Sequence, residues 1–233
     1  MTAPATLSDA FEQICLMDGS LNDRLRAYAE KLKELNFPFS EAYDNLVARL
    51  MAGEVGAAAP KVGDVMPPFV LPSHRGELVG LEELLEMGPV VISLNRGHWC
   101  PFCKIELRTI AAHHREIAQA GAHVVSILPD KQNFTGKLRA DTRDAITILT
   151  DVDNGYALSL GLVMWLGDQL RNLMQGRGIH LDAIQGNEGW YVPLPATFVV
   201  GKNGRVVARH VDPEFRTRME IDDILTALAA SRD

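Results

Sequence analysis

The sequence Val90-Val91-Ile92-Ser93-Leu94 lies shortly before Cys100-Pro101-Phe102-Cys103, and the two stretches together decide the fold. The first is a short apolar run, which predicts a buried strand. A helical pattern begins at Pro101, a residue type favoured as the first of a helix, so Cys100 is expected at the N-cap. Two cysteines separated by two residues, at a turn from a strand into a helix, are typical of redox sites.

Composition excludes several other classes of protein. The 233 residues are 47% hydrophobic, which is enough for one large domain or for a domain with an extension. A formal net charge of −7 argues against partners such as nucleic acid or an anionic membrane surface. No apolar run approaches the roughly 20 residues needed to cross a membrane, and the first residues lack the pattern of a signal peptide. We therefore expect a cytoplasmic protein, in which paired cysteines seldom form a structural disulfide.

Residues 1–58 are predicted to form a helical extension. Two stripes of apolar residues recur there at helical spacing: Leu21, Leu25, Tyr28, Ala29, Leu32 and Leu35 in the first, and Phe39, Ala42, Tyr43, Leu46, Val47, Leu50 and Met51 in the second. Ser20 with Asp23 resembles a capping box, and Ser40 is expected to be the N-cap of the second helix. The stripes indicate packing against the main domain or, alternatively, a homodimer surface. Residues 53–63, rich in Gly, Ala and Pro, are expected to be a linker.

Residues 61–233 are predicted to be the main domain, an α/β fold with a mixed central sheet flanked by helices. Short apolar runs that predict strands alternate with helical patterns: the expected strands are 69–71, 90–94, 123–128 and 145–149, and the expected helices are 101–120 and 131–142. This alternation favours parallel strands joined by right-handed crossovers.

The last part of the chain adds a hairpin, a helix and an insert. Asn203-Gly204 separates apolar runs at 196–200 and 205–211, which predicts an antiparallel hairpin. Thr217 and Glu220 predict a capping box for a final helix. Residues 156–192 are interpreted as an insert that shapes the entrance to the two cysteines.

The two cysteines of the turn have separate expected roles. Unpaired N–H groups and the positive dipole end at the helix start favour the thiolate of Cys100, and Arg96, His98 and Lys104 are candidates to add positive charge. Cys103 lies one turn further along the same face, so it is expected to be the resolving cysteine. Attack on a peroxide gives a sulfenic acid and attack on a disulfide gives a mixed disulfide. Both routes end in the same Cys100–Cys103 disulfide.

Other roles for the cysteines are weaker interpretations. No second C-x-x-C or H-x-x-x-H pattern completes a zinc site, and His113 and His114 lie nearly four turns along the helix, so we expect neither a metal nor a cofactor. Inert core cysteines are disfavoured, because a helix start that follows a buried strand is expected to be an accessible edge. Cys15, in the N-terminal helices, is interpreted as a small buried hydrophobe.

The two cysteines and their surroundings resemble the thioredoxin superfamily. Arg96–Cys103 is similar to the redox turn of that superfamily. Pro195–Val200, followed by Lys202–Val206, resembles its second landmark, in which a proline, usually cis, precedes a strand and faces the dithiol. The resemblance implies a thioredoxin-like fold, with Trp99 and Pro195 as substrate-positioning residues.

A second set of residues resembles one branch of that superfamily. Lys61–Asp64 with Pro68–Leu71 is similar to the opening of the alkyl hydroperoxide reductase/thiol-specific antioxidant (AhpC/TSA) branch. His210–Pro213 with Arg216 and Arg218 resembles the tail of its peroxiredoxin-like members. The resemblance spans residues 61–233 and implies a thiol-dependent redox enzyme.

The turn departs from the peroxiredoxin pattern P-x-x-x-T-x-x-C at the positions that orient a peroxide. When the pattern is aligned on Cys100, the proline position is Ser93 and the threonine position is Gly97. Pro195 occupies the position of the second peroxide-binding element, an arginine. The candidates to replace that arginine are Arg96, Arg177 and Arg209.

Three functions are consistent with these residues. The first is a peroxiredoxin-like antioxidant enzyme that reduces peroxides through Cys100 and resolves through Cys103. The second is a thioredoxin-like thiol–disulfide oxidoreductase acting on protein or small-molecule disulfides, which the C-x-x-C spacing and Pro195 favour. In both, a dithiol electron donor such as thioredoxin reduces the resulting disulfide. The third is a non-enzymatic redox sensor or interaction module built on the same fold.

Overall fold

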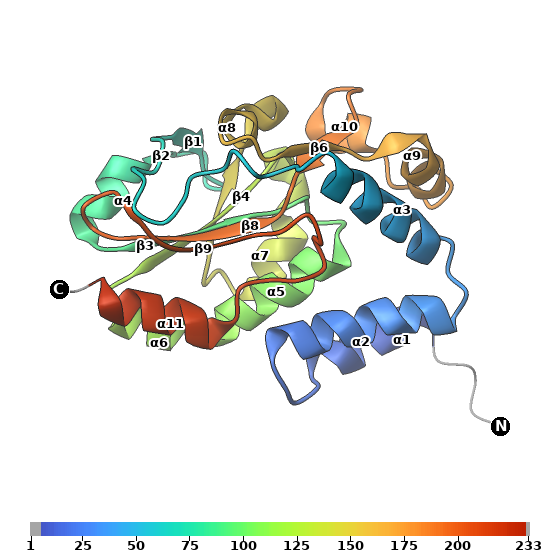
Figure 1. Ribbon diagram of the computed structural model, residues 1–233, viewed down its shortest axis with the longest axis horizontal. Coiled ribbons are helices and arrows are strands. Elements are labelled where there is room, and N and C mark those ends of the chain that lie inside the picture. Colours follow the sequence, from blue (N-terminus) through green and yellow to red (C-terminus); the bar gives the residue numbers. More distant parts are fainter. Residues whose placement is uncertain (1–5, 232–233) are drawn as a thin grey trace.

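The computed structural model describes residues 6–231, shown as a ribbon in Figure 1. The expectation about a signal peptide concerns residues that lie mostly outside this range. The helices are α1 (Leu7–Cys15), α2 (Leu21–Glu34), α3 (Phe39–Ala52), α4 (Leu81–Met87), α5 (Pro101–Ala112), α6 (His114–Gln119), α7 (Gly136–Thr142), α8 (Gly155–Ser159), α9 (Gly167–Gln175), α10 (Leu181–Gln185) and α11 (Ile221–Ala230). Short 3-10 helices occur at Gln132–Phe134 and Val152–Asn154.

The core is a five-stranded mixed sheet with the order β5-β4-β3-β8-β9. Its strands are β3 (Val90–Leu94), β4 (His123–Leu128), β5 (Thr147–Thr150), β8 (Ala196–Val200) and β9 (Val206–Val211). β3, β4 and β5 are parallel, whereas β8 and β9 run antiparallel to their neighbours. The predicted mixed α/β fold is therefore confirmed, including the hairpin around Asn203-Gly204.

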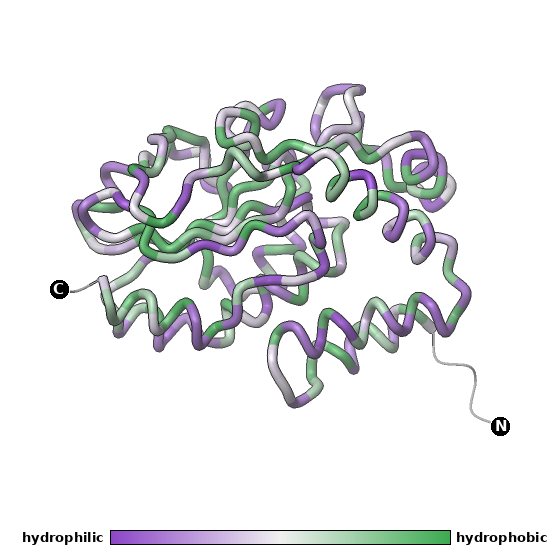
Figure 2. The backbone as a smooth tube through the Cα atoms, viewed as in Figure 1, coloured by the Kyte–Doolittle hydropathy of each residue, from purple (hydrophilic) through white to green (hydrophobic). Residues whose placement is uncertain are grey.

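Both faces of the sheet are buried. Side chains alternate between the faces along a strand, so Ile92 and Val91 on β3 belong to two different clusters of buried residues. Ile92 lies opposite Val125 on β4 and Phe198 on β8. Figure 1 shows α5, α6, α7 and α11 on one side of this sheet, and Figure 2 shows hydrophobic residues along its central strands.

Several element boundaries differ slightly from the predictions. The strand expected at 69–71 is β1 (Val70–Pro72), which pairs with β2 (Leu78–Gly80). The strand expected at 145–149 begins two residues later, at Thr147. The single helix expected over 101–120 is two helices, α5 and α6, which meet at His113.

The N-terminal helices pack against the rest of the chain. Leu25 and Tyr28 on α2 and Leu46 on α3 are buried, and α2 contacts α5. The capping box of Ser20 and Asp23 is confirmed at the start of α2. The prediction for Ser40 is wrong, because α3 begins at Phe39 and Ser40 lies inside its first turn. Packing against the rest of the chain thus buries most of both stripes, whereas Leu35 and Met51 at their ends are exposed.

The start of α2 is bound to the segment before α11. The carboxylate of Glu220 accepts hydrogen bonds of 2.9 Å from the N–H groups of Leu21 and Asn22. The Asn22 amide also bonds the N–H and the carbonyl of Arg218. The predicted capping box of Thr217 and Glu220 is therefore wrong: α11 has no side-chain cap, because the Glu220 carboxylate binds the free N–H groups at the start of α2.

The segment interpreted as an insert, residues 156–192, belongs to a small unit beside α3. This unit spans residues 155–193 and contains α8, α9, α10 and the two-stranded antiparallel sheet of β6 (Val163–Trp165) and β7 (Tyr191–Pro193). Arg49 on α3 donates a hydrogen bond of 2.6 Å to the carbonyl of Trp165. The segment 53–63, expected to be a linker, is a series of turns packed on the domain, since a Cβ at Gly56 would lie 2.8 Å from Val211.

Over residues 6–231, every helix is too short or too polar to cross a membrane.

Candidate redox site

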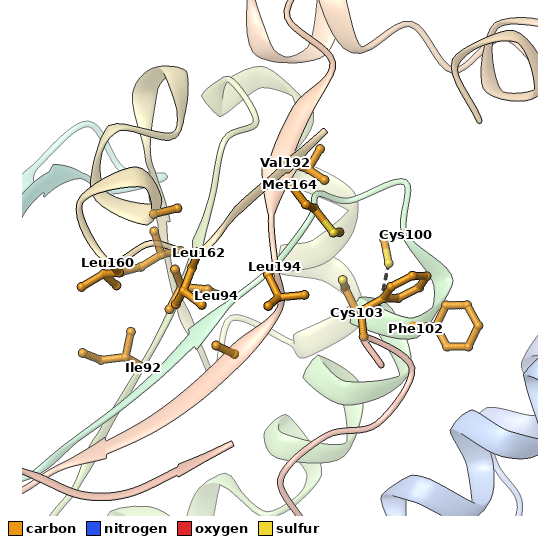
Figure 3. Packing of buried hydrophobic residues seen from close by; sticks show 14 of the residues in the cluster. Ile92, Leu94, Cys100, Phe102, Cys103, Leu160, Leu162, Met164, Val192 and Leu194 are labelled. Carbon is orange, nitrogen blue, oxygen red and sulfur yellow. Dashed lines mark hydrogen bonds between the residues drawn. The ribbon is translucent and has the colours of Figure 1, made fainter. Parts of the chain in front are cut away.

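The two cysteines of the turn lie at the start of α5, directly after the loop that follows β3. Cys100 is the N-cap of this helix, as predicted, and its Sγ accepts a hydrogen bond of 3.3 Å from the N–H of Cys103 (Figure 3). Neither cysteine is in a disulfide. The N–H groups of the first helical turn thus stabilise negative charge on the Cys100 sulfur.

The turn is covered, contrary to the expectation of an accessible edge. Cys100 and Cys103 are both 0% exposed. Phe102, between them, packs edge-on against Tyr28 and Tyr43, with ring centroids 5.3 and 5.9 Å away. Those tyrosines belong to α2 and α3, so the N-terminal helices bury the redox turn.

Arg96 is the cation beside Cys100. Its side chain is 0% exposed, and Nη2 donates to Cys100 Sγ over 3.0 Å. Its guanidinium lies over the rings of Tyr43, Trp99 and Phe215, at 5.4, 5.4 and 4.2 Å from their centroids. Within residues 6–231 no carboxylate lies within ion-pair distance of it. The Cys100 sulfur, when ionised, is therefore its counter-ion.

These contacts lower the pKa of Cys100 well below that of an ordinary thiol. Burial alone would raise the pKa, because it disfavours the thiolate. The hydrogen bond with the Cys103 side chain, the charge of Arg96 and the Cys103 N–H outweigh burial and favour the thiolate. Of the two sulfurs, Cys100 thus has the greater thiolate character.

Cys103 has the opposite properties. Burial raises the pKa of its thiol, and its hydrogen bond to the charged Cys100 raises it further. Arg218 Nη2 lies 3.9 Å from Cys103 Sγ, but its Nε donates over 2.9 Å to the carboxylate of Glu106, which is also buried. Because Glu106 balances the charge of Arg218, Cys103 stays protonated while Cys100 is ionised.

A buried polar network explains why two positions depart from the peroxiredoxin pattern. Ser93 donates to Glu106 Oε1 over 3.2 Å and accepts from Asn95 over 2.7 Å, so it holds the carboxylate in place. Gly97 has φ +139°, and a Cβ there would lie 2.5 Å from Trp99 Nε1. A threonine does not fit at that position.

The other predicted site residues lie in different surroundings. Trp99 is half-buried beside Arg96. Pro195 is buried directly before β8, and its neighbour Leu194 shares a buried cluster with both cysteines (Figure 3). The peptide bond before Pro195 is trans, unlike the cis bond usual for this proline in the superfamily, and residues 6–231 contain no cis peptide bond.

Of the three arginines considered as replacements, only Arg96 touches a site cysteine. Arg209 instead donates to the carbonyls of Ala59 and Pro60. Arg177 stacks on Phe37, with its Cζ 3.9 Å from the ring centroid.

The remaining predicted cations are paired with carboxylates. His98 bonds the carboxylate of Asp130 over 2.7 Å, and the Lys104 ammonium lies 3.8 Å from Asp141. Sequence reasoning named Arg218 only as part of a tail motif and missed its place at the dithiol, 115 residues from Cys103.

Metal-binding residues do not gather at this site or elsewhere in residues 6–231: no group of three or more His, Cys, Asp or Glu side chains is placed to hold an ion.

A mixed central sheet flanked by helices, with Cys100 at the start of the helix that follows the central strand, matches the thioredoxin-like fold. The sequence model of the AhpC/TSA family matches residues 62–209, more than half of the chain, so this protein belongs to that family. It is accordingly an oxidoreductase of the peroxiredoxin-like kind.

Solved structures share this fold at low sequence identity. Peroxidoxin BcpB from Mycobacterium tuberculosis is 23% identical, with a TM-score of 0.57, and the match covers 75% of this chain and 99% of that one. Peroxiredoxin 6 of Arenicola marina is 16% identical, with a TM-score of 0.58 and coverage of 74% and 73%. The yeast mitochondrial 1-Cys peroxiredoxin is 12% identical, with a TM-score of 0.55 and coverage of 74% and 76%. No curated protein gives a significant sequence match.

Replacing Arg96 is expected to change the pH at which Cys100 ionises. In the unaltered protein the lowered pKa keeps the thiolate at neutral pH, and alkylation slows only as the pH falls through that pKa. Arg96→Gln removes the favourable charge, so the pKa rises toward the ordinary value of about 8.5 and alkylation at neutral pH slows. The measurement is the rate of iodoacetamide alkylation against pH in a Cys15→Ser background. Arg75→Gln, at an exposed arginine, is the control, and an unchanged profile in Arg96→Gln would contradict the assignment.

Gly97→Ala is expected to lower the free energy of unfolding more than a glycine substitution that adds backbone strain alone. The new Cβ meets Trp99 Nε1 and Asp130 Oδ1 at 2.5 and 2.6 Å, and φ is positive. The expected loss is about 2–4 kcal/mol, measured by urea unfolding. Gly76→Ala, with φ +84° and nothing within 4 Å of its Cβ, is the control and should cost about 1–2 kcal/mol. Equal losses would show that contact with the Trp99 and Asp130 side chains is unimportant.

Proposed function

We propose that this protein is a thiol peroxidase in which Cys100 reduces peroxides and Cys103 resolves the product. One observation carries the proposal: Arg96 Nη2 bonds Cys100 Sγ, while Nε and Nη1 of the same buried guanidinium have no hydrogen-bond partner within residues 6–231. Buried N–H donors seldom lack partners. Here they supply a ready site for an oxygen acceptor next to the nucleophile.

Arg96 thereby replaces the peroxide-binding groups that the sequence pattern lacks. Peroxide oxygens accept hydrogen bonds, and the guanidinium presents its donors in one rigid plane. The Cys100 thiolate attacks the outer oxygen of ROOH, the S–O bond forms and the O–O bond breaks. The products are Cys100 sulfenic acid and RO⁻, and the alkoxide takes a proton to become ROH. Positive charge beside the departing oxygen stabilises that step.

Cys103 completes the cycle within the same chain. Its thiol condenses with the sulfenic acid, giving the Cys100–Cys103 disulfide and one molecule of water. The yeast structural relative is described as resolved via glutathione/thioredoxin systems. For this protein we propose a dithiol donor of the thioredoxin type in the cytoplasm, which transfers two electrons and two protons to the disulfide. Because both cysteines lie in one chain, the cycle requires no second subunit.

The second candidate is a thiol–disulfide oxidoreductase. The C-x-x-C spacing and the buried Pro195 before β8 favour it. Burial of the site disfavours this candidate. Both cysteines are 0% exposed, whereas attack on a protein disulfide requires Cys100 Sγ to approach along the axis of the substrate's S–S bond. A peroxide is far smaller and requires less opening of the covering helices. The third candidate, a redox sensor, forms the same Cys100–Cys103 disulfide but does not turn over a substrate.

The two enzymatic candidates are distinguished by mixing reduced protein separately with hydrogen peroxide and with insulin. We expect rapid oxidation of Cys100 by the peroxide, followed through the fluorescence of the adjacent Trp99, and slow reduction of insulin. A peroxide rate no faster than that of a free thiol would refute the peroxidase. Reversible disulfide formation without turnover of either substrate would favour the sensor.

Serine substitutions test the two cysteine roles. Cys100→Ser is expected to abolish peroxide reduction, since it removes the nucleophile. Cys103→Ser should react once with peroxide and then accumulate a sulfenic acid, detected by dimedone labelling and mass spectrometry. Cys15→Ser is the matched control and should keep full activity, because Cys15 lies at the end of α1. Full recycling by Cys103→Ser with a thioredoxin donor would refute its role as resolver.

A further inference from the structure

A cavity of about 370 Å³ lies between the redox turn and the N-terminal helices. Its volume falls within the range of roughly 300–1,000 Å³ typical of sites for small organic molecules. Neither site cysteine lines it, and Arg96 does not line it either, so the cavity lies beside the dithiol rather than around it. Six aromatic rings form part of its wall, and they belong to Phe11, Tyr28, Phe37, Phe39, Tyr43 and Trp99.

The rings of the N-terminal helices lie against one another. Phe37 and Phe39 are stacked, with ring centroids 5.6 Å apart, and Phe39 contacts Tyr43 at 5.7 Å. Phe11 meets Tyr28 edge-on at 5.8 Å. A ligand with an aromatic ring of its own gains stacked or edge-on contacts with such a wall, in addition to the burial of its apolar area. The wall therefore favours a flat aromatic ligand over a saturated one of the same size.

The charge of the lining is positive, although the whole chain carries a formal net charge of −7. Lys104 and Arg177 are the charged lining residues in the described part of the chain. Lys104 has Asp141 at 3.8 Å, whereas Arg177 has no carboxylate within ion-pair distance in residues 6–231. The Cζ of Arg177 instead lies 3.9 Å from the ring centroid of Phe37. A carboxylate attached to the aromatic ring of a ligand complements these cations, and the planar guanidinium fits its two oxygens.

Occupancy of the cavity bears on access to Cys100. Cys100 is 0% exposed, and the residues on either side of it in the chain, Trp99 and Pro101, both line the cavity. Trp99 and Tyr43 also cover the guanidinium of Arg96, which lies 5.4 Å from each ring centroid. A reagent reaches the buried sulfur only when covering groups move. A ligand packed on Trp99 and Pro101 opposes that movement.

The aromatic wall belongs largely to the part of the chain that the family model does not match. Five of the six rings come from α1, α2, α3 and the turn between α2 and α3, all before residue 62, where the match begins. Trp99, Lys104 and Arg177 lie within the matched segment. The cavity is thus formed where the N-terminal helices meet the family domain, and it needs both.

We propose that this cavity is an effector site for a small aromatic monocarboxylate, which binds without reacting and restricts access to Cys100. The ring of the ligand lies among the aromatic side chains of the N-terminal helices, and its carboxylate lies at Arg177 and Lys104. No bond forms or breaks, so the ligand is not a substrate. The inference does not depend on which oxidant Cys100 reduces.

Binding is tested by isothermal titration calorimetry of the reduced full chain with four probes. They are 3-phenylpropanoate, its neutral amide, its saturated analogue 3-cyclohexylpropanoate and the cation 3-phenylpropylammonium. We expect the aromatic acid to bind with a Kd below about 1 mM. The amide and the saturated acid should each bind at least about fivefold more weakly, because one lacks the charge and the other lacks the ring. The cation should not bind.

Variants of the lining place the ligand in the cavity. Ser8→Trp adds a bulky ring at an exposed lining position on α1, and it should weaken binding of the aromatic acid at least about tenfold. Gln13→Trp, exposed on the same helix and outside the lining, is the matched control and should change nothing. Arg177→Gln should weaken the acid about tenfold and leave the amide unchanged, whereas the exposed Arg75→Gln should affect neither. Thermal unfolding reports whether each variant is folded.

The effect on access is measured by iodoacetamide alkylation of Cys100 in a Cys15→Ser background, with the labelled residue identified by mass spectrometry. A saturating concentration of 3-phenylpropanoate should slow alkylation at least about threefold, because reagent and ligand require opposite positions of the covering groups. The same concentration should have no effect on alkylation of Ser8→Trp.

Each part of the proposal has a result that overturns it. No binding of the aromatic acid up to about 5 mM, or binding unaltered in Ser8→Trp, would overturn the site. Equal affinity for the acid and its amide would overturn the carboxylate, and equal affinity for the saturated acid would overturn the aromatic ring. Binding that leaves alkylation of Cys100 unchanged would overturn the restriction of access. The reaction of the unliganded protein with peroxide is measured separately, so its failure would contradict only the proposed function.

Discussion

The buried contact between Arg96 and Cys100 Sγ is the constraint on which the site depends. A guanidinium that is 0% exposed requires a negative partner, because an unpaired buried charge is strongly destabilising. No carboxylate in residues 6–231 provides one, so the thiolate does. Ionised Cys100 is thus the favoured reduced state, and oxidation to a neutral sulfur leaves the cation unbalanced. This imbalance favours return to the reduced state.

The second arginine explains why the two cysteines behave differently. Arg218 lies 3.9 Å from Cys103 Sγ, yet Glu106 already balances its charge through a bond of 2.9 Å. Burial raises the pKa of Glu106, and the charge of Arg218 opposes that rise. Each sulfur therefore has an arginine as its neighbour. Arg96 has Cys100 as its counter-ion, whereas Arg218 already has Glu106. The nucleophile and resolver roles that we propose rest on this difference as well as on the places of the two cysteines in the turn.

Local sequence patterns predicted what depends on neighbours along the chain. The buried strand at Val90–Leu94, the N-cap position of Cys100 and the hairpin at Asn203-Gly204 each follow from a few adjacent residues. Patterns failed where a distant group competed. Glu220 binds the start of α2 instead of capping its own helix, and burial of the cysteines results from helices far before them. The pairing of Arg96 with Cys100 depends on a side-chain direction that spacing does not specify.

The parts outside the family-matched segment are connected to the dithiol through one stretch of chain. Glu220 and Asn22 bind the start of α2 to the segment before α11, and the same Asn22 bonds the backbone of Arg218. The Arg218 side chain in turn lies against Cys103 and Glu106. A shift of α2 would therefore strain the position of Arg218, and would uncover Phe102 at the same time. The N-terminal helices that cover the redox turn are thus held by the same segment that places Arg218 beside Cys103.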